Sequence, residues 1–132
     1  MDKANYNFSG RHGIGEMFDV PIDVLNNTHY MCSVLEKIMK KHDLHQIGLN
    51  KKDFIPMGAT IFYLLTESHL SIHTYPEHNA LFFDLFICGS KYDTETIFKD
   101  IAKSFKAKRY SFYEIKRGAT QNIHSNFETA DC

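Results

Sequence analysis

Residues 59–88, ATIFYLLTESHLSIHTYPEHNALFFDLFIC, contain three strand-like runs in close succession. The first run, Ala59–Thr66, is rich in β-branched and aromatic residues, which favour strands. Leu70–Tyr75 alternates with the period of two that sends side chains to opposite faces of a sheet. Ala80–Cys88 is largely apolar on both faces, as expected for a strand that is covered on two sides. Because short turns join neighbouring antiparallel strands, the three runs predict an antiparallel centre for the fold.

Upstream of these runs, the sequence predicts a strand, a helix and a connection into the sheet. Gly13–Phe18 is expected to form a short strand. Asp19 and Pro21 are helix-start signals, because proline is tolerated in the first turn of a helix. Residues 42–50 should then carry the chain into the sheet. The helix between them would bury one apolar stripe, formed by Val24, Leu25, Thr28, Met31, Cys32, Leu35, Ile38 and Met39.

Downstream, the sequence predicts a second helix and a last strand. Asp93 resembles an N-cap, and the apolar residues Ile97, Ile101 and Phe105 follow at a spacing of four. Lys108–Ile115 is expected to form the final strand, and residues 118–132 a loose polar tail.

The resulting order, β-α-β-β-β-α-β, predicts a single α+β domain over residues 1–132. Its architecture would be a two-layer sandwich in which two helices cover one face of an antiparallel sheet. The strands carry many aromatic residues for the opposite face as well. We therefore expect that face to be covered by a second copy of the chain, in a homodimer.

Composition and charge exclude several classes of protein. The net charge of −1 gives no reason to expect binding to nucleic acid or to an anionic membrane. Three widely spaced cysteines form neither a disulfide framework nor a zinc signature. The N-terminal residues are too polar for a secretory signal, and the longest apolar stretch is far short of a membrane span. We expect a cytoplasmic protein that binds a small molecule.

The residues with reactive side chains lie in and around Leu70–Tyr75, the middle one of the three strand-like runs. Thr66–Glu77 and Asp84–Gly89 place a hydroxyl, imidazoles, carboxylates and a thiol in or beside central strands. Taken singly, such residues are more often turn, structural or core residues. Two histidine pairs, His69 with His73 and His42 with His45, have a spacing of four, but no third ligand has a convincing spacing. We expect no metal site.

As a whole, the arrangement resembles the signature of the prokaryotic S-adenosylmethionine decarboxylase proenzyme family. The residues that carry the resemblance are Glu67-Ser68-His69-Leu70, Ile72-His73-Thr74, Pro76-Glu77 and, further on, Phe86-Ile87-Cys88-Gly89. Gly10-Arg11-His12, Phe54-Ile55-Pro56-Met57-Gly58 and Lys106-Ala107-Lys108-Arg109 extend it over nearly the whole chain.

The resemblance implies that the chain cuts itself between Glu67 and Ser68, giving residues 1–67 and 68–132. Ser68 would become a pyruvoyl group, which forms a Schiff base with the substrate amine and withdraws electrons as CO₂ leaves. No pyridoxal phosphate would be needed. His73 would be the base in processing, because histidine exchanges protons near neutral pH. Cys88 would donate the proton that completes decarboxylation. Thr60 stands where the family has a processing serine and keeps its hydroxyl.

For the substrate, the resemblance implies that Phe54 and Tyr75 stack on the adenine of S-adenosylmethionine and that Glu77 binds the ribose hydroxyls. Tyr75 replaces the more usual tryptophan. The product would be the aminopropyl donor for spermidine synthesis. Two alternatives stay open at this point. The same pyruvoyl chemistry could serve arginine or ornithine, and the chain could be an unprocessed regulatory or binding homologue.

Overall fold

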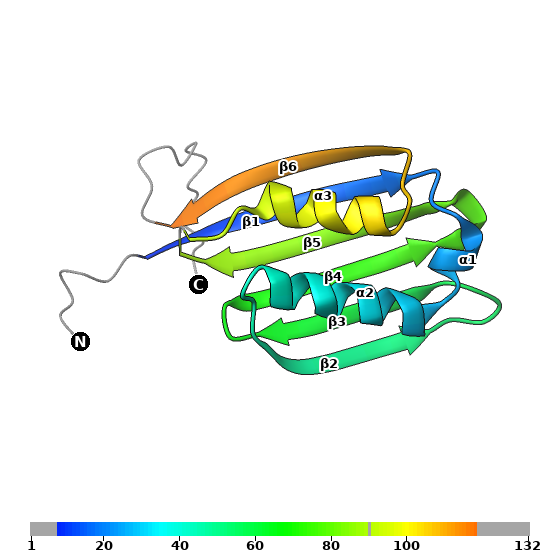
Figure 1. The fold of residues 1–132 in the computed structure, drawn as a ribbon, viewed down its shortest axis with the longest axis horizontal. Helices are drawn as coiled ribbons and strands as arrows, with labels where there is room; N and C mark the ends of the chain where they lie inside the picture. The colour runs from blue at the N-terminus through cyan, green and yellow to red at the C-terminus, as the bar shows by residue number, and fades with distance from the viewer. Residues whose placement is uncertain (1–7, 90, 119–132) are drawn as a thin grey trace, which may run out of the picture.

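The computed structural model describes residues 8–89 and 91–118, and within them six antiparallel strands form one sheet (Figure 1). The strand order across the sheet is β2-β3-β4-β5-β1-β6. In chain order the strands are β1 (Ser9–Phe18), β2 (Gln46–Asp53), β3 (Ala59–Leu65), β4 (Ser68–Tyr75), β5 (Ala80–Cys88) and β6 (Arg109–Gly118). The three runs of residues 59–88 are the consecutive neighbours β3, β4 and β5, as predicted.

Helices α1 (Ile22–Leu25), α2 (Thr28–Lys41) and α3 (Thr94–Ser104) lie on one face of this sheet (Figure 1). The Asn27 side chain caps α2 by accepting a hydrogen bond from the Tyr30 backbone N–H, and Asp93 caps α3 in the same way through Thr96. One face of every central strand is buried against the helices. The largest fully buried side chains include Tyr63, Phe98, Phe105, Met17, Leu25, Met31 and Leu35.

The predicted α+β class is confirmed, but the predicted order lacks one strand. Residues 46–53 form β2, at an edge of the sheet, where the sequence analysis expected only a connection. The side chains of β2 are mostly exposed, and its apolar alternation is limited to Ile47 and Leu49 before Lys51 and Lys52, which is too short to predict a strand. Exposed lysines are typical of an edge strand, because they discourage pairing with other chains.

Two predicted boundaries are also wrong. The single helix expected after Pro21 is divided into α1 and α2, because Asn27 interrupts the helical stripe and caps a new helix. Gly118, expected in the tail, pairs with Ser9 as the last residue of β6. The remainder of the predicted tail, residues 119–132, lies outside the described residues.

The face of the sheet opposite the helices is apolar over much of its area. Phe62 on β3, Phe82 on β5, and Tyr113 and Ile115 on β6 are between 38% and 62% exposed. Isolated exposed apolar residues are ordinary, whereas a set of them on one sheet face marks an interaction surface. This helix-free face also carries the alternate residues of β4, and thereby part of the candidate site.

No helix in the described part of the chain combines the length and the hydropathy of a membrane span. The predicted cytoplasmic setting, and the predicted lack of a nucleic-acid partner, stay predictions.

Candidate active site

The Glu67–Ser68 bond lies in the tight turn between β3 and β4. Thr66 and Glu67 form the turn, and Ser68 pairs with Leu65 as the first residue of β4. Ser68 has a φ of +150°, a positive value that residues with a side chain rarely adopt. Such a backbone costs on the order of 1–3 kcal/mol and persists only where the surroundings hold it. The predicted cleavage point is therefore a strained residue in an otherwise regular hairpin.

Cys88 holds the Glu67 carbonyl, which lies on the N-terminal side of the Glu67–Ser68 bond. Its backbone N–H donates a hydrogen bond to the Glu67 carbonyl oxygen, at 3.0 Å. Charge develops on this oxygen when a nucleophile attacks the carbonyl, and a fixed N–H donor stabilises that charge. The Cys88 side chain is exposed and lines a cavity of about 300 Å³ together with Phe8, Ser9, Gly10, Phe86, Arg117 and Gly118.

His69 is the ring that the Ser68 hydroxyl contacts. Its Nδ1 lies 3.3 Å from Ser68 Oγ, and its Nε2 lies 3.6 Å from Asp84 Oδ1. Asp84 Oδ1 is also 2.7 Å from Nε2 of His12 on β1. A histidine between a hydroxyl and a carboxylate is arranged to accept the hydroxyl proton. The sequence analysis named His69 in the resemblance motif and in a histidine pair, but it did not predict this contact.

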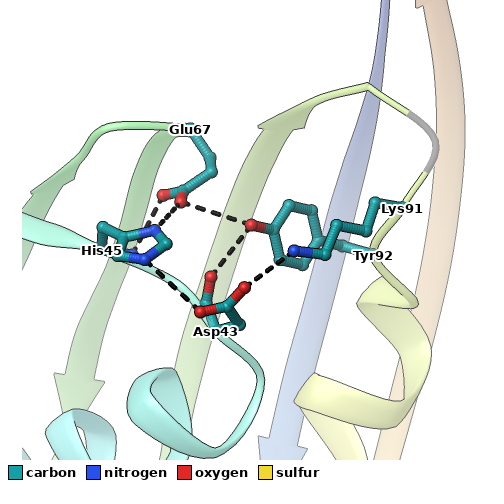
Figure 2. Close-up of polar contacts among 5 residues, drawn as sticks. All are labelled: Asp43, His45, Glu67, Lys91 and Tyr92. Carbon is teal, nitrogen blue, oxygen red and sulfur yellow. Dashed lines mark hydrogen bonds and ion pairs between the residues drawn. The ribbon is translucent and has the colours of Figure 1, made fainter.

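The Glu67 side chain is held from two other loops (Figure 2). Its carboxylate is 11% exposed and accepts hydrogen bonds from the His45 backbone N–H at 3.1 Å and from His45 Nδ1 at 2.5 Å. The Tyr92 hydroxyl lies 3.3 Å from Glu67 Oε1 and 2.9 Å from the Asp43 carbonyl oxygen. Asp43 in turn pairs with Lys91 at 2.7 Å and lies 3.4 Å from His45 Nε2.

The negative charge of Glu67 and the positive charge of His45 stabilise each other. Burial raises the pKa of Glu67, but the hydrogen bonds from His45 lower it by more, so it lies below the ordinary 4.5. The hydrogen bond to Glu67 raises the pKa of His45 above the ordinary 6.5. The ion pair is therefore complete between pH 4.5 and 6.5. It is lost as the pH falls through the lowered pKa of Glu67 or rises through the raised pKa of His45.

A second group of predicted residues lies at the other end of β4. Thr60 Oγ1 and His73 Nδ1 are 2.6 Å apart, on residues that pair directly between β3 and β4. The His73 ring lies between those of Phe54 and Tyr75, with centroid distances of 5.8 and 4.6 Å. Glu77 follows in the short 3-10 helix Pro76–His78. Thr60 and His73 line a cavity of about 260 Å³ that also includes Ser71, Phe82 and Asp84.

The structure does not bring these two groups together within one chain. Ser68 and His73 are five residues apart on the same strand, which at about 3.3 Å per residue separates them by roughly 16 Å. A base must lie within hydrogen-bond reach of the proton that it removes, so His73 cannot serve Ser68 of its own chain in this conformation. The role predicted for His73 stays a prediction.

The two histidine pairs with a spacing of four contact other side chains in this structure. His42 pairs with Asp100 and His45 with Glu67, while His69 and His73 contact different groups. Among residues 8–89 and 91–118, no three His, Cys, Asp or Glu side chains gather as they would around a metal ion.

The structure combines a helix-backed antiparallel sheet with a Glu–Ser pair at a hairpin and a cysteine beside it on the next strand. It is the arrangement expected of a pyruvoyl-dependent decarboxylase, the class that the sequence motif resembles. The residues around Ser68 fit the formation of a pyruvoyl group, because the neighbouring carbonyl is already held by an N–H donor.

Comparisons with known proteins agree on one family. A family model described as S-adenosylmethionine decarboxylase matches residues 11–118. An S-adenosylmethionine decarboxylase proenzyme of Archaeoglobus fulgidus is 36% identical over 109 residues, which are 83% of this chain and 97% of the relative. An S-adenosylmethionine decarboxylase proenzyme 2 of Bacillus cereus is 33% identical over 113 residues, covering 86% and 92% of the two chains.

A solved structure gives the same result. The crystal structure of adenosylmethionine decarboxylase from Aquifex aeolicus superimposes with a TM-score of 0.79 at 28% sequence identity. The match covers 91% of this chain and 99% of that chain. This chain belongs to the S-adenosylmethionine decarboxylase family.

Proposed function

We propose that this protein is a proenzyme that cuts its own Glu67–Ser68 bond and then decarboxylates S-adenosylmethionine. Decarboxylation would yield the aminopropyl donor for spermidine synthesis. The observation that carries the proposal is the hydrogen bond from the Cys88 N–H to the Glu67 carbonyl, directly beside the strained Ser68. Family membership supplies the chemistry that such a site would perform.

In the first step of processing, Ser68 Oγ attacks the carbonyl carbon of Glu67. A C–O bond forms and the C–N bond breaks, so the amide becomes an ester. The hydroxyl proton passes to the nitrogen of Ser68, with His69 as the ring in reach for the transfer. The attack profits from proximity, since nucleophile and carbonyl belong to adjacent residues, and the Cys88 N–H stabilises the developing oxyanion.

In the second step, a base removes the Ser68 Cα proton and the Cβ–Oγ bond breaks. Glu67 leaves as the carboxylate end of residues 1–67. Water then hydrolyses the remaining dehydroalanine, ammonia leaves, and residues 68–132 begin with the pyruvoyl group. We assign the removal of the proton to His73 of a second copy of the chain, because His73 of the same chain lies roughly 16 Å away.

A homodimer that packs the helix-free faces together would complete this site. Exposed Phe62, Phe82, Tyr113 and Ile115 make that face apolar. Both groups of site residues include side chains on the same face. An isologous dimer juxtaposes residue i of one chain with residue j of the other, and the reverse. The Ser68 end of each chain would thereby meet the His73 end of its partner.

Thr60→Val is expected to slow maturation by about 2- to 10-fold. The hydroxyl of Thr60 lies 2.6 Å from His73 Nδ1, and one hydrogen bond of that kind contributes about 0.5–1.5 kcal/mol. Valine keeps the shape and the stiffness of the side chain. The rate of appearance of the two product chains on a denaturing gel measures the effect. A Thr60→Val protein that matures as fast as the wild type would remove Thr60 from this role.

For decarboxylation, the pyruvoyl group would supply the electron sink when CO₂ leaves. Cys88 would return a proton to the substrate carbon, as the exposed thiol beside the cavity at the Ser68 end. Phe54 and Tyr75 would stack on the adenine, and Glu77 would accept hydrogen bonds from the ribose hydroxyls. Phe54 is 42% exposed, so one face of its ring is available for stacking.

Substrate choice is tested by CO₂ release from matured protein incubated separately with S-adenosylmethionine, arginine and ornithine. Release is expected from S-adenosylmethionine and only at background level from the two amino acids, because neither offers an adenine or a ribose to Phe54, Tyr75 and Glu77. Faster release from arginine or ornithine would assign the same pyruvoyl chemistry to that amino acid. A chain that stays uncut and releases nothing would be the regulatory homologue.

A further inference from the structure

Glu67, the residue on the N-terminal side of the bond that the proposed function cuts, is held both at its side chain (Figure 2) and at its backbone carbonyl. Its carboxylate accepts hydrogen bonds from the backbone and the ring of His45, and its carbonyl oxygen accepts one from the Cys88 N–H. The backbone carbonyl of His45 also accepts a hydrogen bond from the Thr66 N–H, at 2.8 Å. The loop between α2 and β2 is thus attached to the cleavage turn at several atoms.

The cluster joins the two chains that cleavage would create. Asp43, His45 and Glu67 belong to residues 1–67, whereas Lys91 and Tyr92 belong to residues 68–132. The Tyr92 hydroxyl contacts both Asp43 and Glu67, and Lys91 pairs with Asp43. Burial, reinforced by the charge of Glu67, raises the pKa of Tyr92, so its hydroxyl stays a donor. These contacts need no peptide bond between Glu67 and Ser68, and they can persist after it is cut.

Such an anchor has a physical purpose in a self-cleaving turn. The attack by Ser68 Oγ depends on the orientation of a single peptide unit, and a misplacement of about 1 Å can cost a factor of about 10² in rate. After cleavage, Glu67 becomes a chain end, and chain ends fray unless they are tied down. A free end beside the pyruvoyl group would disturb the cavity that Cys88 lines.

We propose, on the basis of the proposed self-cleavage, that His45 and Tyr92 are positioning residues that hold the Glu67 side chain. Before cleavage they orient the Glu67 carbonyl between Ser68 Oγ and the Cys88 N–H. After cleavage they retain the new C-terminus of residues 1–67 at the same place.

The first test compares His45→Ala with His42→Ala. His42 is a matched control, because its ring also pairs with a carboxylate, at 2.7 Å, but that carboxylate belongs to Asp100 on α3 and not to Glu67. The first-order rate constant of self-cleavage is measured by intact mass on freshly made protein, and folding is checked by thermal unfolding. His45→Ala is expected to cut about 10- to 100-fold more slowly than the wild type. His42→Ala is expected to cut at the wild-type rate.

A conservative variant separates positioning from folding. The side-chain amide of Asn can replace the Nδ1–H donor of His45 but carries no charge, so His45→Asn is expected to recover most of the lost rate. The ratio of wild-type to His45→Asn rate constants should fall as the pH rises above 6.5 and through the raised pKa of His45, because His45 then loses its proton. Titratable groups that both proteins share change both rate constants with pH, and their effect cancels in this ratio. Those facing His45 are Asp43, Glu67, Lys91 and Tyr92.

The second test concerns the new chain end. Tyr92→Phe removes one hydroxyl and preserves the ring, so the fold should be kept. Carboxypeptidase is added to matured protein, and loss of Glu67 from residues 1–67 is followed by mass. Loss is expected to be several-fold faster in Tyr92→Phe and in matured His45→Ala than in the wild type and His42→Ala.

The outcomes distinguish the anchor from the function on which it rests. A wild-type protein that never cuts would overturn the self-cleavage and the anchor together. If the wild type cuts but folded His45→Ala cuts equally fast, or His45→Asn recovers no rate, the positioning role is wrong and the self-cleavage stands. Equal release of Glu67 from all variants would refute retention of the chain end.

Discussion

A Ser68→Ala protein is expected to remain one uncut polypeptide and to release no CO₂ from S-adenosylmethionine. The substitution removes the only atom, Ser68 Oγ, that would attack the Glu67 carbonyl, and it removes the precursor of the pyruvoyl group as well. Both losses should be complete rather than partial, because no neighbouring hydroxyl can form the pyruvoyl group at this position. Alanine and serine pay similar strain at a φ of +150°, so the fold should be retained.

Intact mass before and after incubation measures this result directly. The wild type should give residues 1–67 and 68–132, and borohydride with substrate should add mass only to the second chain. Ser33→Ala is the matched control, since it removes an exposed hydroxyl from α2, on the other layer of the domain, and should cut normally. Cutting of Ser68→Ala at the wild-type rate would show that another group breaks the chain and would refute the pyruvoyl mechanism.

The parts of the fold that could be predicted are the elements that bury one face, because burial of one face requires apolar residues at a regular spacing in the sequence. The runs that became β3, β4 and β5 each bury one face, so their alternation is visible in residues 59–88. Strand β2 buries almost nothing, and a strand held by backbone pairing alone leaves no such trace. The break at Asn27 was missed for a related reason, because the apolar stripe continues across it into α2.

In the candidate site as well, residues that are close together in the sequence could be predicted, whereas residues that are far apart in the sequence could not. The sequence could indicate the predicted catalytic residues because they form a compact motif with recognisable chemistry. These residues are Glu67, Ser68, His73 and Cys88. His45 and Tyr92 lie 22 and 25 residues from Glu67, and no spacing rule connects loops that meet only in the folded chain. The separation of Ser68 from His73 is present in the sequence as five residues, but it becomes informative only because the structure places both residues in one continuous strand, β4.

The distance between Ser68 and His73 within one chain leads to the second large effect. Two variants that do not cut efficiently alone are expected to restore cleavage when they are combined. His73→Ala is expected to cut about 10²- to 10⁴-fold more slowly than the wild type, as for the loss of a general base. Ser68→Ala is expected not to cut at all. When the two are co-expressed, a mixed dimer has one intact site, formed by Ser68 of the His73→Ala chain and His73 of the Ser68→Ala chain. Cleavage should therefore return in the mixture, although neither variant cuts efficiently alone.

The direction of the rescue is as informative as its occurrence. With a distinguishing tag on one chain, only the His73→Ala chain should be cut, because only it retains Ser68. Random pairing of equal amounts places about half of those chains in mixed dimers, so about half of them should mature. A mixture that stays uncut, while co-expressed wild-type chains mature, would refute a site shared between chains. The base would then have to come from within reach of Ser68 in its own chain, where His69 already contacts the hydroxyl.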